Sequence, residues 1–446
     1  MLSYYIRLAL KSFGRNRGLT ALMIGTIALG ISACVVMLTV YHAMSGNPIW
    51  WKNDRLYAVT IDNWDPGRPA DPRYPELPPT QLSYRDAGYL AASNIPEHAV
   101  VMFKARGVVT GGVTKHAPLP VITRVTTADF FTMFDVPFLF GGGWNKRADR
   151  GPEPVIVLSK EENERLFGGV NSVGHTVRWN DHEFRVIGVL DSWMPLPKFY
   201  DINNDPLEAP EDLYIPYGWT EALELLSGGN NSCWRGDTLK SYREYLNSDC
   251  IWQQMWVEIP SARGVEHMQA LLHSYWLQQR QSGRFPRPEN NRLTRVDQWL
   301  KDHHVVQSDD RILVGLALAF FAVCLINTVG LLLAKFLNGA PISGVRRALG
   351  ASRRDVFTQH LVEAAMLAAA GAALGLLLSA LELWGLRAMD AATQVHPDGG
   401  YQQLAHVDFI SVVATVGLAI VATLCAGFYP AWRIGRLLPA VYLKSQ

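Results

Sequence analysis

Four long apolar runs constrain this chain more than any other feature of its sequence. They lie at residues 19–41, 312–334, 364–381 and 409–428. Crossing a bilayer core of about 30 Å takes about 20 helical residues, and the first two runs contain no charged residue. The runs therefore predict an α-helical membrane protein with four transmembrane helices. One helix precedes a large segment at 42–311, and three follow it.

A cleaved signal peptide is the alternative interpretation of the first run, because "HAMSG" after Tyr41 resembles a cleavage site. The apolar core of a signal peptide usually has about 7–15 residues, and this run is longer. We therefore expect a permanent first span.

The distribution of basic residues predicts the orientation of the spans. Segments 1–18, 335–363 and 429–446 together carry 12 basic and 2 acidic residues, whereas 42–311 carries 28 basic and 34 acidic residues. Loops rich in Lys and Arg remain in the cytoplasm. We expect both termini and the 335–363 loop to be cytoplasmic, and 42–311 and the short 382–408 loop to lie outside.

The segment at 42–311 is too long for a loop and must fold as a domain. Its short alternating runs, such as "EPVIVLS" and "HEFRVIGVL", are typical of strands, and we expect an α+β fold. Cys233 and Cys250 both lie in it. They could form a disulfide in an oxidising compartment, and two free buried thiols fit the sequence equally well.

A stalk helix is predicted near 292–311. Apolar residues at Leu293, Val296, Leu300 and Val305 follow helical spacing, and the helix would continue into the second span. An ordinary juxtamembrane linker is the alternative.

Several motifs are missing from the sequence. It contains no G-x-x-x-x-G-K-[ST], no G-x-S-x-G and no H-E-x-x-H. We therefore expect no nucleotide site, catalytic residue, metal or cofactor in this chain, and no nucleic-acid partner. The spans lack internal Lys, Arg, Asp and Glu, which argues against an ion-coupled carrier. A membrane-anchored enzyme using Asp181, His182 and Glu183, or a receptor, remains the alternative of another class.

Small residues in the first and third spans predict close helix packing. Gly25 and Gly30 lie in the first span, and Gly371 and Gly375 form "GAALG" in the third. Small residues at such spacing allow helix backbones to approach each other within a membrane.

Four arginines stand between the second and third apolar runs, in "GVRRALGASRRDVFTQHLVEA" at 344–364. Two glycines punctuate this stretch, and a small apolar pair separates the two arginine pairs. Arg makes bidentate contacts with the carboxylates of a partner. The alternative is that these arginines only keep the loop in the cytoplasm. The residues concerned are Gly344, Arg346, Arg347, Ala348, Leu349, Gly350, Arg353 and Arg354.

The same stretch resembles the "EIGIRRALGASRRDI…EA" signature of MacB/FtsX-type ABC transporter permeases, the type VII mechanotransmission family. Further likenesses extend along nearly the whole chain. They are "IRLALKSFGRNRG" (6–18), "RVTTADFFTMFDVPFLFGGGW" (124–144), "PVIVLSKEENERLFGGVNSVGHTVRWNDHEFRVIGVL" (154–190), "DLYIPY" (212–217) and "YPAWRIGRLLPAVYL" (429–443). The chain departs from the family at Ile342, Ser343 and Leu438, which leaves open a weakened coupling site.

The resemblance implies a MacB-like periplasmic core domain at 42–311 and an amphipathic cytoplasmic helix at 1–18. It also implies a bacterial inner-membrane location among membrane lipids. The arginine-rich loop would dock on a separate cytoplasmic ABC ATPase, which would bind the ATP and Mg. A second permease copy or a paralogue, a periplasmic adaptor and an outer-membrane duct are the other implied partners. Efflux of a peptide or small molecule is the leading implied function, ahead of lipoprotein release and control of cell-wall hydrolases.

Overall fold

The computed structural model describes residues 2–112, 118–235, 239–305 and 308–392, together with six single positions between 413 and 432. The chain divides into two compact units. We call residues 1–45 with 306–446 the helical unit, and residues 46–305 the sheet unit.

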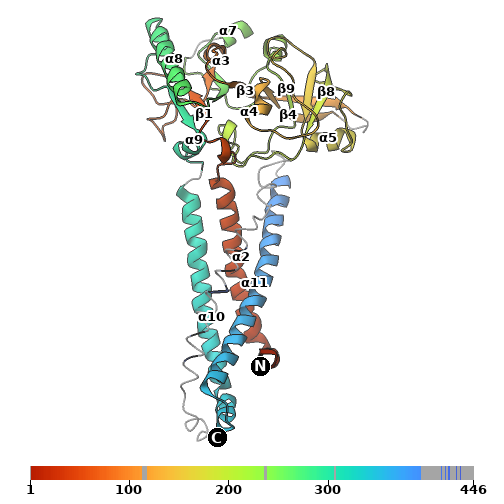
Figure 1. Cartoon of the computed structure of the whole chain (residues 1–446), viewed down its shortest axis with the longest axis vertical. Coiled ribbons are helices and arrows are strands. Elements are labelled where there is room, and N and C mark those ends of the chain that lie inside the picture. The colour runs from red at the N-terminus through yellow and green to blue at the C-terminus, as the bar shows by residue number, and fades with distance from the viewer. Residues whose placement is uncertain are drawn as a thin grey trace. The chain divides into compact units, whose positions relative to one another are not determined.

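Among the described residues, the helical unit contains three long helices and one shorter helix, and the long ones run side by side (Figure 1). These are α1 (Leu2–Arg15), α2 (Arg17–Ser45), α10 (Ser308–Ala348) and α11 (Arg353–Ala392). Residues 17–42, 312–338 and 353–386 within them are long and apolar enough to cross a membrane. They coincide with the first three predicted spans. The fourth predicted span at 409–428, the 393–408 segment and the 429–446 tail lie almost entirely outside the described residues.

α2 packs between α10 and α11 (Figure 1). Ile27 and Ile31 of α2 are buried against Phe321 of α10 and Ala372 of α11. Three of the four predicted packing glycines lie at these contacts.

Adding a Cβ atom at each of these three glycines shows how closely the helices pack. It would come within 2.8 Å of Phe321 Cδ2 at Gly30, within 2.5 Å of Ile27 Cγ2 at Gly371, and within 2.9 Å of the Ala28 carbonyl oxygen at Gly375. Gly25 is different, because a Cβ there would meet no described atom within 4 Å. The described part of the chain thus gives no packing role to Gly25.

The sheet unit contains one mixed sheet of eleven strands (Figure 1), and its path runs β11-β1-β10-β3-β4-β9-β6-β8-β5. β2 pairs with β10, and β7 with β3 and β8. The β4–β9 and β6–β8 pairs are parallel, and the others are antiparallel. The strands are β1 (Leu56–Thr60), β2 (Leu82–Ser83), β3 (His98–Gly111), β4 (Leu119–Thr126), β5 (Phe138–Gly141), β6 (Val155–Leu158), β7 (Thr176–Trp179), β8 (His182–Leu190), β9 (Leu213–Pro216), β10 (Ile251–Glu258) and β11 (Arg292–Arg295).

Short helices accompany the sheet, and only α8 is long. They are η1 (Trp50–Lys52), α3 (Tyr84–Ala91), α4 (Asp129–Met133), α5 (Lys160–Phe167), η2 (Phe199–Asp201), α6 (Trp219–Ala222), α7 (Tyr242–Leu246), α8 (Ala262–Gln281) and α9 (Val296–Asp302). The strands predicted from "EPVIVLS" and "HEFRVIGVL" are β6 and β8, so the α+β prediction is confirmed. Large aromatic side chains fill the cores, including Phe130 and Trp256 in one cluster and Trp179 and Trp252 in another.

The stalk helix predicted at 292–311 is wrong. Residues Arg292–Arg295 form β11, which pairs antiparallel with β1, and α9 then ends at Asp302. A turn at 303–305 follows, with His304 at φ +48°, and α10 begins only at Ser308. The apolar residues that suggested one helical face divide between two cores, because Leu293 packs in the α8 cluster and Val296 in the α9 cluster. The hydrogen bonds between β11 and β1 thus stabilise a strand at 292–295, although the apolar residues there are spaced as on a helix.

The loop predicted at 335–363 is also shorter than expected. α10 continues through Ala348 and α11 starts at Arg353, so only residues 349–352 connect the two helices. Apolar runs mark the membrane-spanning part of a helix, and good helix formers such as Ala, Leu and Arg carry it beyond that part.

A buried ionic cluster joins β4 to the segment before β9. Arg124, with a fully buried side chain, donates to Asp201 at 2.5 Å and to Glu211. Lys198 lies 2.7 Å from Glu211 and 3.2 Å from Glu208. Burial raises the pKa of Glu211, but Arg124 and Lys198 outweigh it and hold that pKa below its ordinary value.

Glu211→Gln should lower the free energy of unfolding by about 3 kcal/mol, because it removes the carboxylate that Arg124 and Lys198 share and leaves each buried cation with one carboxylate, Asp201 or Glu208. Chemical unfolding of the purified protein, followed by circular dichroism, measures this loss. Glu266→Gln on the exposed face of α8 is the control, and we expect a change within about 0.5 kcal/mol. An unchanged unfolding midpoint for Glu211→Gln would contradict a stabilising cluster.

The sign of the pH dependence follows from the lowered pKa of Glu211. A carboxyl group whose pKa falls on folding stabilises the protein above its unfolded pKa, about 4.3 for Glu, and this contribution is lost as the pH falls further. The difference in stability between the wild type and Glu211→Gln should therefore be full near pH 7 and shrink below about pH 4.

Candidate functional site

The α10–α11 turn is the tightest feature of the predicted coupling segment. Gly350 has φ +105°, a conformation that suits glycine. Its N–H donates to the Arg347 carbonyl at 3.1 Å, and the Ala351 N–H donates to the Arg346 carbonyl at 3.1 Å. This pair of bonds is a Schellman motif, which ends α10.

α11 begins with a capping box. The Ser352 Oγ accepts from the Asp355 N–H at 3.2 Å, and the Asp355 carboxylate accepts from the Ser352 N–H at 3.0 Å. These reciprocal bonds satisfy donors that a helix start leaves free. A glycine stop followed directly by a serine cap makes the reversal a rigid four-residue corner.

The corner exposes an apolar tip with basic flanks. Leu349 is 83% exposed, and Arg353 and Arg354 are exposed at the start of α11. Gly344 and Ala348 belong to the last turns of α10, as do the half-buried Arg346 and Arg347. The eight predicted coupling residues thus lie within eleven positions around one corner, with Leu349, Arg353 and Arg354 in an exposed tip and Arg346 and Arg347 in a more buried base.

Arg346 belongs to the base, since its guanidinium has partners within the chain. It donates to the Tyr4 hydroxyl at 2.8 Å and to Gln359, and it lies over the Tyr4 ring at 5.7 Å. Sequence reasoning predicted an outside partner for Arg346 and missed Tyr4.

α1 packs against the corner and α11 through one face. The Tyr5 hydroxyl donates to Asp355 Oδ1 at 3.1 Å, and Ser12 Oγ donates to Glu363 Oε1 at 2.5 Å. Tyr5 and Ala9, one helical turn apart, are buried. The amphipathic pattern indicated a helix here but not its docking surface.

A buried ion pair links α10 to α11 below the corner. Lys335 Nζ lies 2.7 Å from Glu363 Oε1, with both side chains at most 3% exposed. The Phe13 ring lies 4.7 Å from Lys335 Nζ. The ion pair, the Ser12 hydrogen bond to Glu363 and the contact of Phe13 with Lys335 thus connect three helices.

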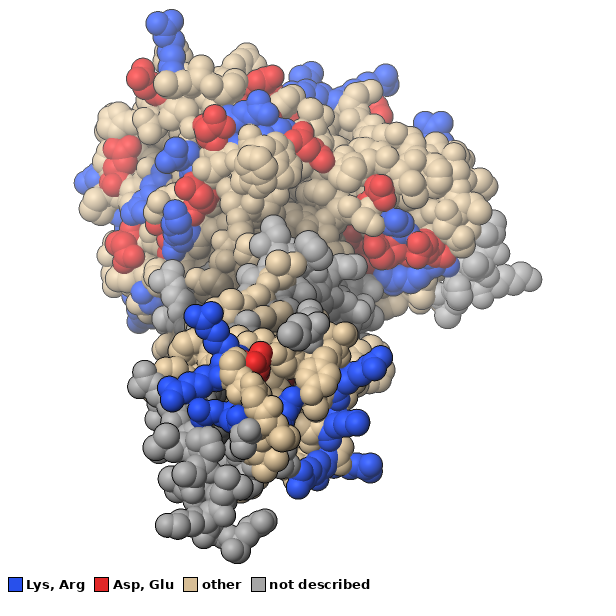
Figure 2. Space-filling model, turned by 60° about the horizontal axis from the view of Figure 1, so that its bottom comes forward, with Lys and Arg blue, Asp and Glu red and all other residues tan. Residues whose placement is uncertain are grey.

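Basic side chains surround the end of the helical unit that carries α1 and the α10–α11 corner, as Figure 2 shows. Arg7, Lys11, Arg15 and Arg17 of the first two helices are exposed there in addition to the tip arginines. Such an end attracts acidic surfaces and anionic headgroups.

The sheet unit holds the other predicted sites. Cys233 and Cys250 form a disulfide in the structure, and Cys34 and Cys324 are free and buried in the helical unit. Among the described residues there is no group of three or more potential metal ligands.

The alternative acid–base cluster is a hairpin turn. Asn180 and Asp181 have φ values of +44° and +67° and reverse the chain between β7 and β8. His182 and Glu183 begin β8 and are exposed, so nothing gathers these side chains around a pocket. Their position in and beside an exposed hairpin turn explains why these residues are polar.

Two family models match the chain. The MacB-like periplasmic core domain matches residues 20–274, and the FtsX-like permease C-terminal domain matches residues 314–439. The chain belongs to the MacB/FtsX family of ABC transporter permeases. Members of this family work with ABC ATPase partners, and the three apolar helices fit a multi-pass inner-membrane protein.

Two curated relatives share less than a quarter of their aligned residues with this chain. The macrolide export ATP-binding/permease protein MacB of Chlorobium luteolum is 23% identical over 307 residues, which is 68% of this chain and 40% of the relative. The pyoverdine export ATP-binding/permease protein PvdT of Pseudomonas aeruginosa is 23% identical over 450 residues, 99% of this chain and 58% of the relative. The chain thus spans about half the length of these proteins.

Among solved structures, the periplasmic region of MacB from Actinobacillus actinomycetemcomitans covers 55% of this chain and 89% of its own, at a TM-score of 0.34 and 16% identity. The extracellular domain of the noncanonic ABC-type transporter YknZ from Gram-positive bacteria covers 54% of this chain, at a TM-score of 0.33 and 12% identity.

Gly350→Ala should loosen the corner, since a Cβ is strained at φ +105°. We expect faster amide hydrogen exchange over residues 346–356, equivalent to a local loss of about 1 kcal/mol. Hydrogen–deuterium exchange with mass spectrometry measures it. Gly385→Ala is the control, because Gly385 lies in α11 with no described atom within 4 Å of a Cβ. Equal exchange in the two variants would argue against a rigid corner.

Proposed function

We propose that this permease couples ATP hydrolysis in a separate cytoplasmic ABC ATPase to movement of its sheet unit, for export of a peptide or small molecule. The observation that supports this is the corner at 349–352, which presents Leu349 on a rigid base. The names of the curated relatives refer to macrolide and pyoverdine export, and export is carried over from them as part of the proposal.

The tip suits a groove on a partner. An exposed leucine can insert into an apolar pocket, while Arg353 and Arg354 form fork-shaped bonds with carboxylates at its rim. Two hydrogen-bonded helix ends hold the tip in place, so docking loses little conformational entropy. ATP and Mg would be bound by the ATPase.

Long helices suit the transmission of movement. α10 has 41 residues, about 60 Å at 1.5 Å per residue. The contacts at Gly30, Gly371 and Gly375 pack α2 closely against both neighbours, so the three would move as one body. Driving a two-state device from about 1:99 to 99:1 takes about 5.5 kcal/mol of differential binding.

The remaining elements of the proposal follow from charge and family. The basic end of the helical unit would face the cytoplasm with both termini, and the sheet unit would lie in the periplasm. A second permease copy or paralogue, an adaptor and an outer-membrane duct would complete the exporter. Ile342 and Ser343 lie in α10 and Leu438 lies outside the described residues, so weakened coupling through these departures stays a proposal.

Leu349→Asp should abolish stimulation of the partner ATPase, because it places a charge where an apolar side chain would be buried. The measurement is ATP hydrolysis by the ATPase with and without the permease in nanodiscs. Leu226→Asp, at a leucine 63% exposed in the sheet unit, is the matched control and should behave as wild type.

A charge-reversed pair, Arg353→Glu with Arg354→Glu, tests the flanks separately and should reduce co-purification of the ATPase. The thermal unfolding midpoint of the permease should change little, since both side chains are exposed. Undiminished stimulation by both the tip and the flank variants would exclude the corner as the docking site.

A further inference from the structure

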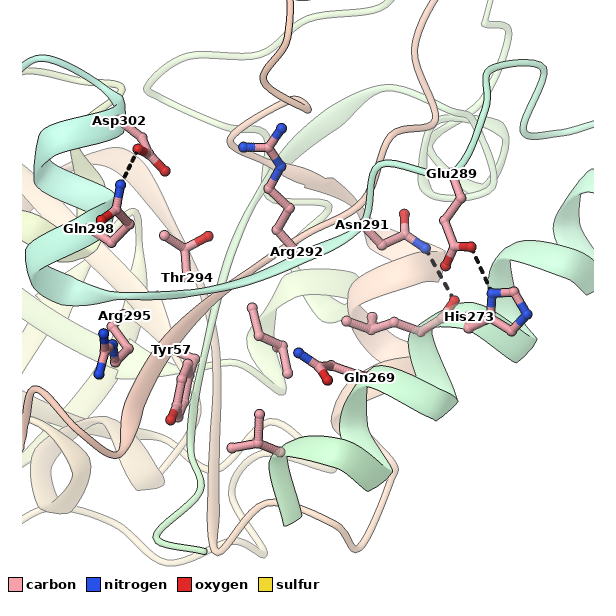
Figure 3. Close-up of a pocket in the computed structure, with 13 residues that line it drawn as sticks. Tyr57, Gln269, His273, Glu289, Asn291, Arg292, Thr294, Arg295, Gln298 and Asp302 are labelled. Carbon is pink, nitrogen blue, oxygen red and sulfur yellow. Dashed lines mark hydrogen bonds and ion pairs between the residues drawn. The ribbon is translucent and has the colours of Figure 1, made fainter. Parts of the chain in front are cut away.

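A groove runs along the outer edge of β11 in the sheet unit. Its volume is about 730 Å³. Figure 3 shows β11 passing between α8, which carries Gln269 and His273, and α9, which carries Gln298 and Asp302. The groove lies within the sheet unit.

The groove borders the edge of β11 and also reaches Tyr57 of β1 on one face of the sheet. All five consecutive residues 291–295 line it. Successive side chains of a strand point to opposite faces, so a cavity that touches every residue in turn must run beside the backbone. β11 ends the sheet order and pairs only with β1 among the described strands. Its other edge therefore borders the groove.

An open edge beside a helix suits an extended peptide. The outer N–H and C=O groups of an edge strand can pair with another strand. The side chains of Val265 and Leu272 on α8 and of Leu293 on β11 form an apolar part of the wall. Alternate side chains of a bound strand would contact this surface.

The groove is lined by two arginines and two carboxylates, so its formal charge is balanced, and a preference for an acidic ligand comes from how these groups are already engaged. Its two carboxylates are already engaged, because Glu289 lies 2.7 Å from His273 Nδ1 and Asp302 accepts from Gln298 Nε2 at 2.5 Å. Arg295 is exposed and has no carboxylate oxygen within 4.0 Å among the described residues.

Arg292, at the other end of the strand, contacts only uncharged oxygens. It donates to Asn290 Oδ1 at 3.1 Å and to the Glu76 carbonyl at 2.6 Å. Two guanidinium groups thus stand at the ends of β11 without a carboxylate partner among the described residues.

We propose that the β11 groove binds an extended, acidic peptide segment of a partner protein by β-strand addition. The ligand would hydrogen-bond to the outer edge of β11 and pair its carboxylates with Arg292 and Arg295. This proposal does not depend on ATPase coupling.

A second copy of this chain fits the groove poorly. Antiparallel pairing of two β11 strands about their centre would place Arg292 of one copy opposite Arg295 of the other. Like charges directly opposite each other destabilise a strand pair. The arginines thus reject self-pairing and admit an acidic strand.

Binding of designed peptides to the full-length protein in nanodiscs tests the proposal. The probe is a fluorescent ten-residue peptide of alternating Glu and Val, compared with its Lys and Val counterpart by fluorescence anisotropy. Two further Glu peptides carry N-methyl groups on the odd or on the even residues, since only one of these two sets can face β11. The protein variants are Arg295→Glu and Arg263→Glu, the latter at an exposed arginine of α8 outside the groove.

We expect saturable binding of the Glu peptide and a loss of about tenfold or more in Arg295→Glu but not in Arg263→Glu. One N-methylation pattern should abolish binding and the other should not. Equal binding of both N-methylated peptides, equal losses in the two variants, or no saturable binding would each overturn the proposal. So would a disulfide between two copies of a Gln298→Cys variant, because a second copy would then occupy the groove.

Discussion

The ion pair between Lys335 and Glu363 is the interaction on which the helical unit most depends. Its side chains are almost fully buried, and the Coulomb attraction must offset the desolvation of both charges. The pair fixes α10 and α11 relative to each other about three to four helical turns from the corner, and Ser12 brings α1 to the same carboxylate. Removing either charge would leave the other buried and alone, so the geometry of the corner is coupled to this pair.

The sequence predicted the three apolar helices that the structure describes, because they depend on local chemistry, but it predicted a longer loop in place of the four-residue corner. Apolar runs of about 20 residues mark spans in any fold, and a glycine followed by Ser352 and Asp355 is a recognisable stop and start. The contacts of Tyr4, Tyr5 and Ser12 join residues about 340–350 positions apart. No local pattern contains such information, so the fixed base of the corner appeared only in the structure.

The failed stalk prediction shows where periodicity misleads. Leu293 and Val296 are spaced as on a helix, yet they belong to a strand and the helix after it, and each enters a different core. A four-residue strand is too short to show alternation. Only the ladder to β1 distinguishes the two structures. The same oversight concealed the edge groove, because a strand must be recognised before its free edge can be considered.

The backbone turn and the serine cap of the corner at 349–352 are made among residues 346–355, and Tyr4 and Tyr5 of α1 hold its two ends. A turn made by a short backbone segment and one serine, and held by two tyrosines of α1, needs both segments to keep its shape. If the corner docks the ATPase as proposed, related permeases that exchanged this segment together with α1 would exchange ATPase partners and keep their own outer domains. The outer domain and the choice of ATPase partner would then evolve independently.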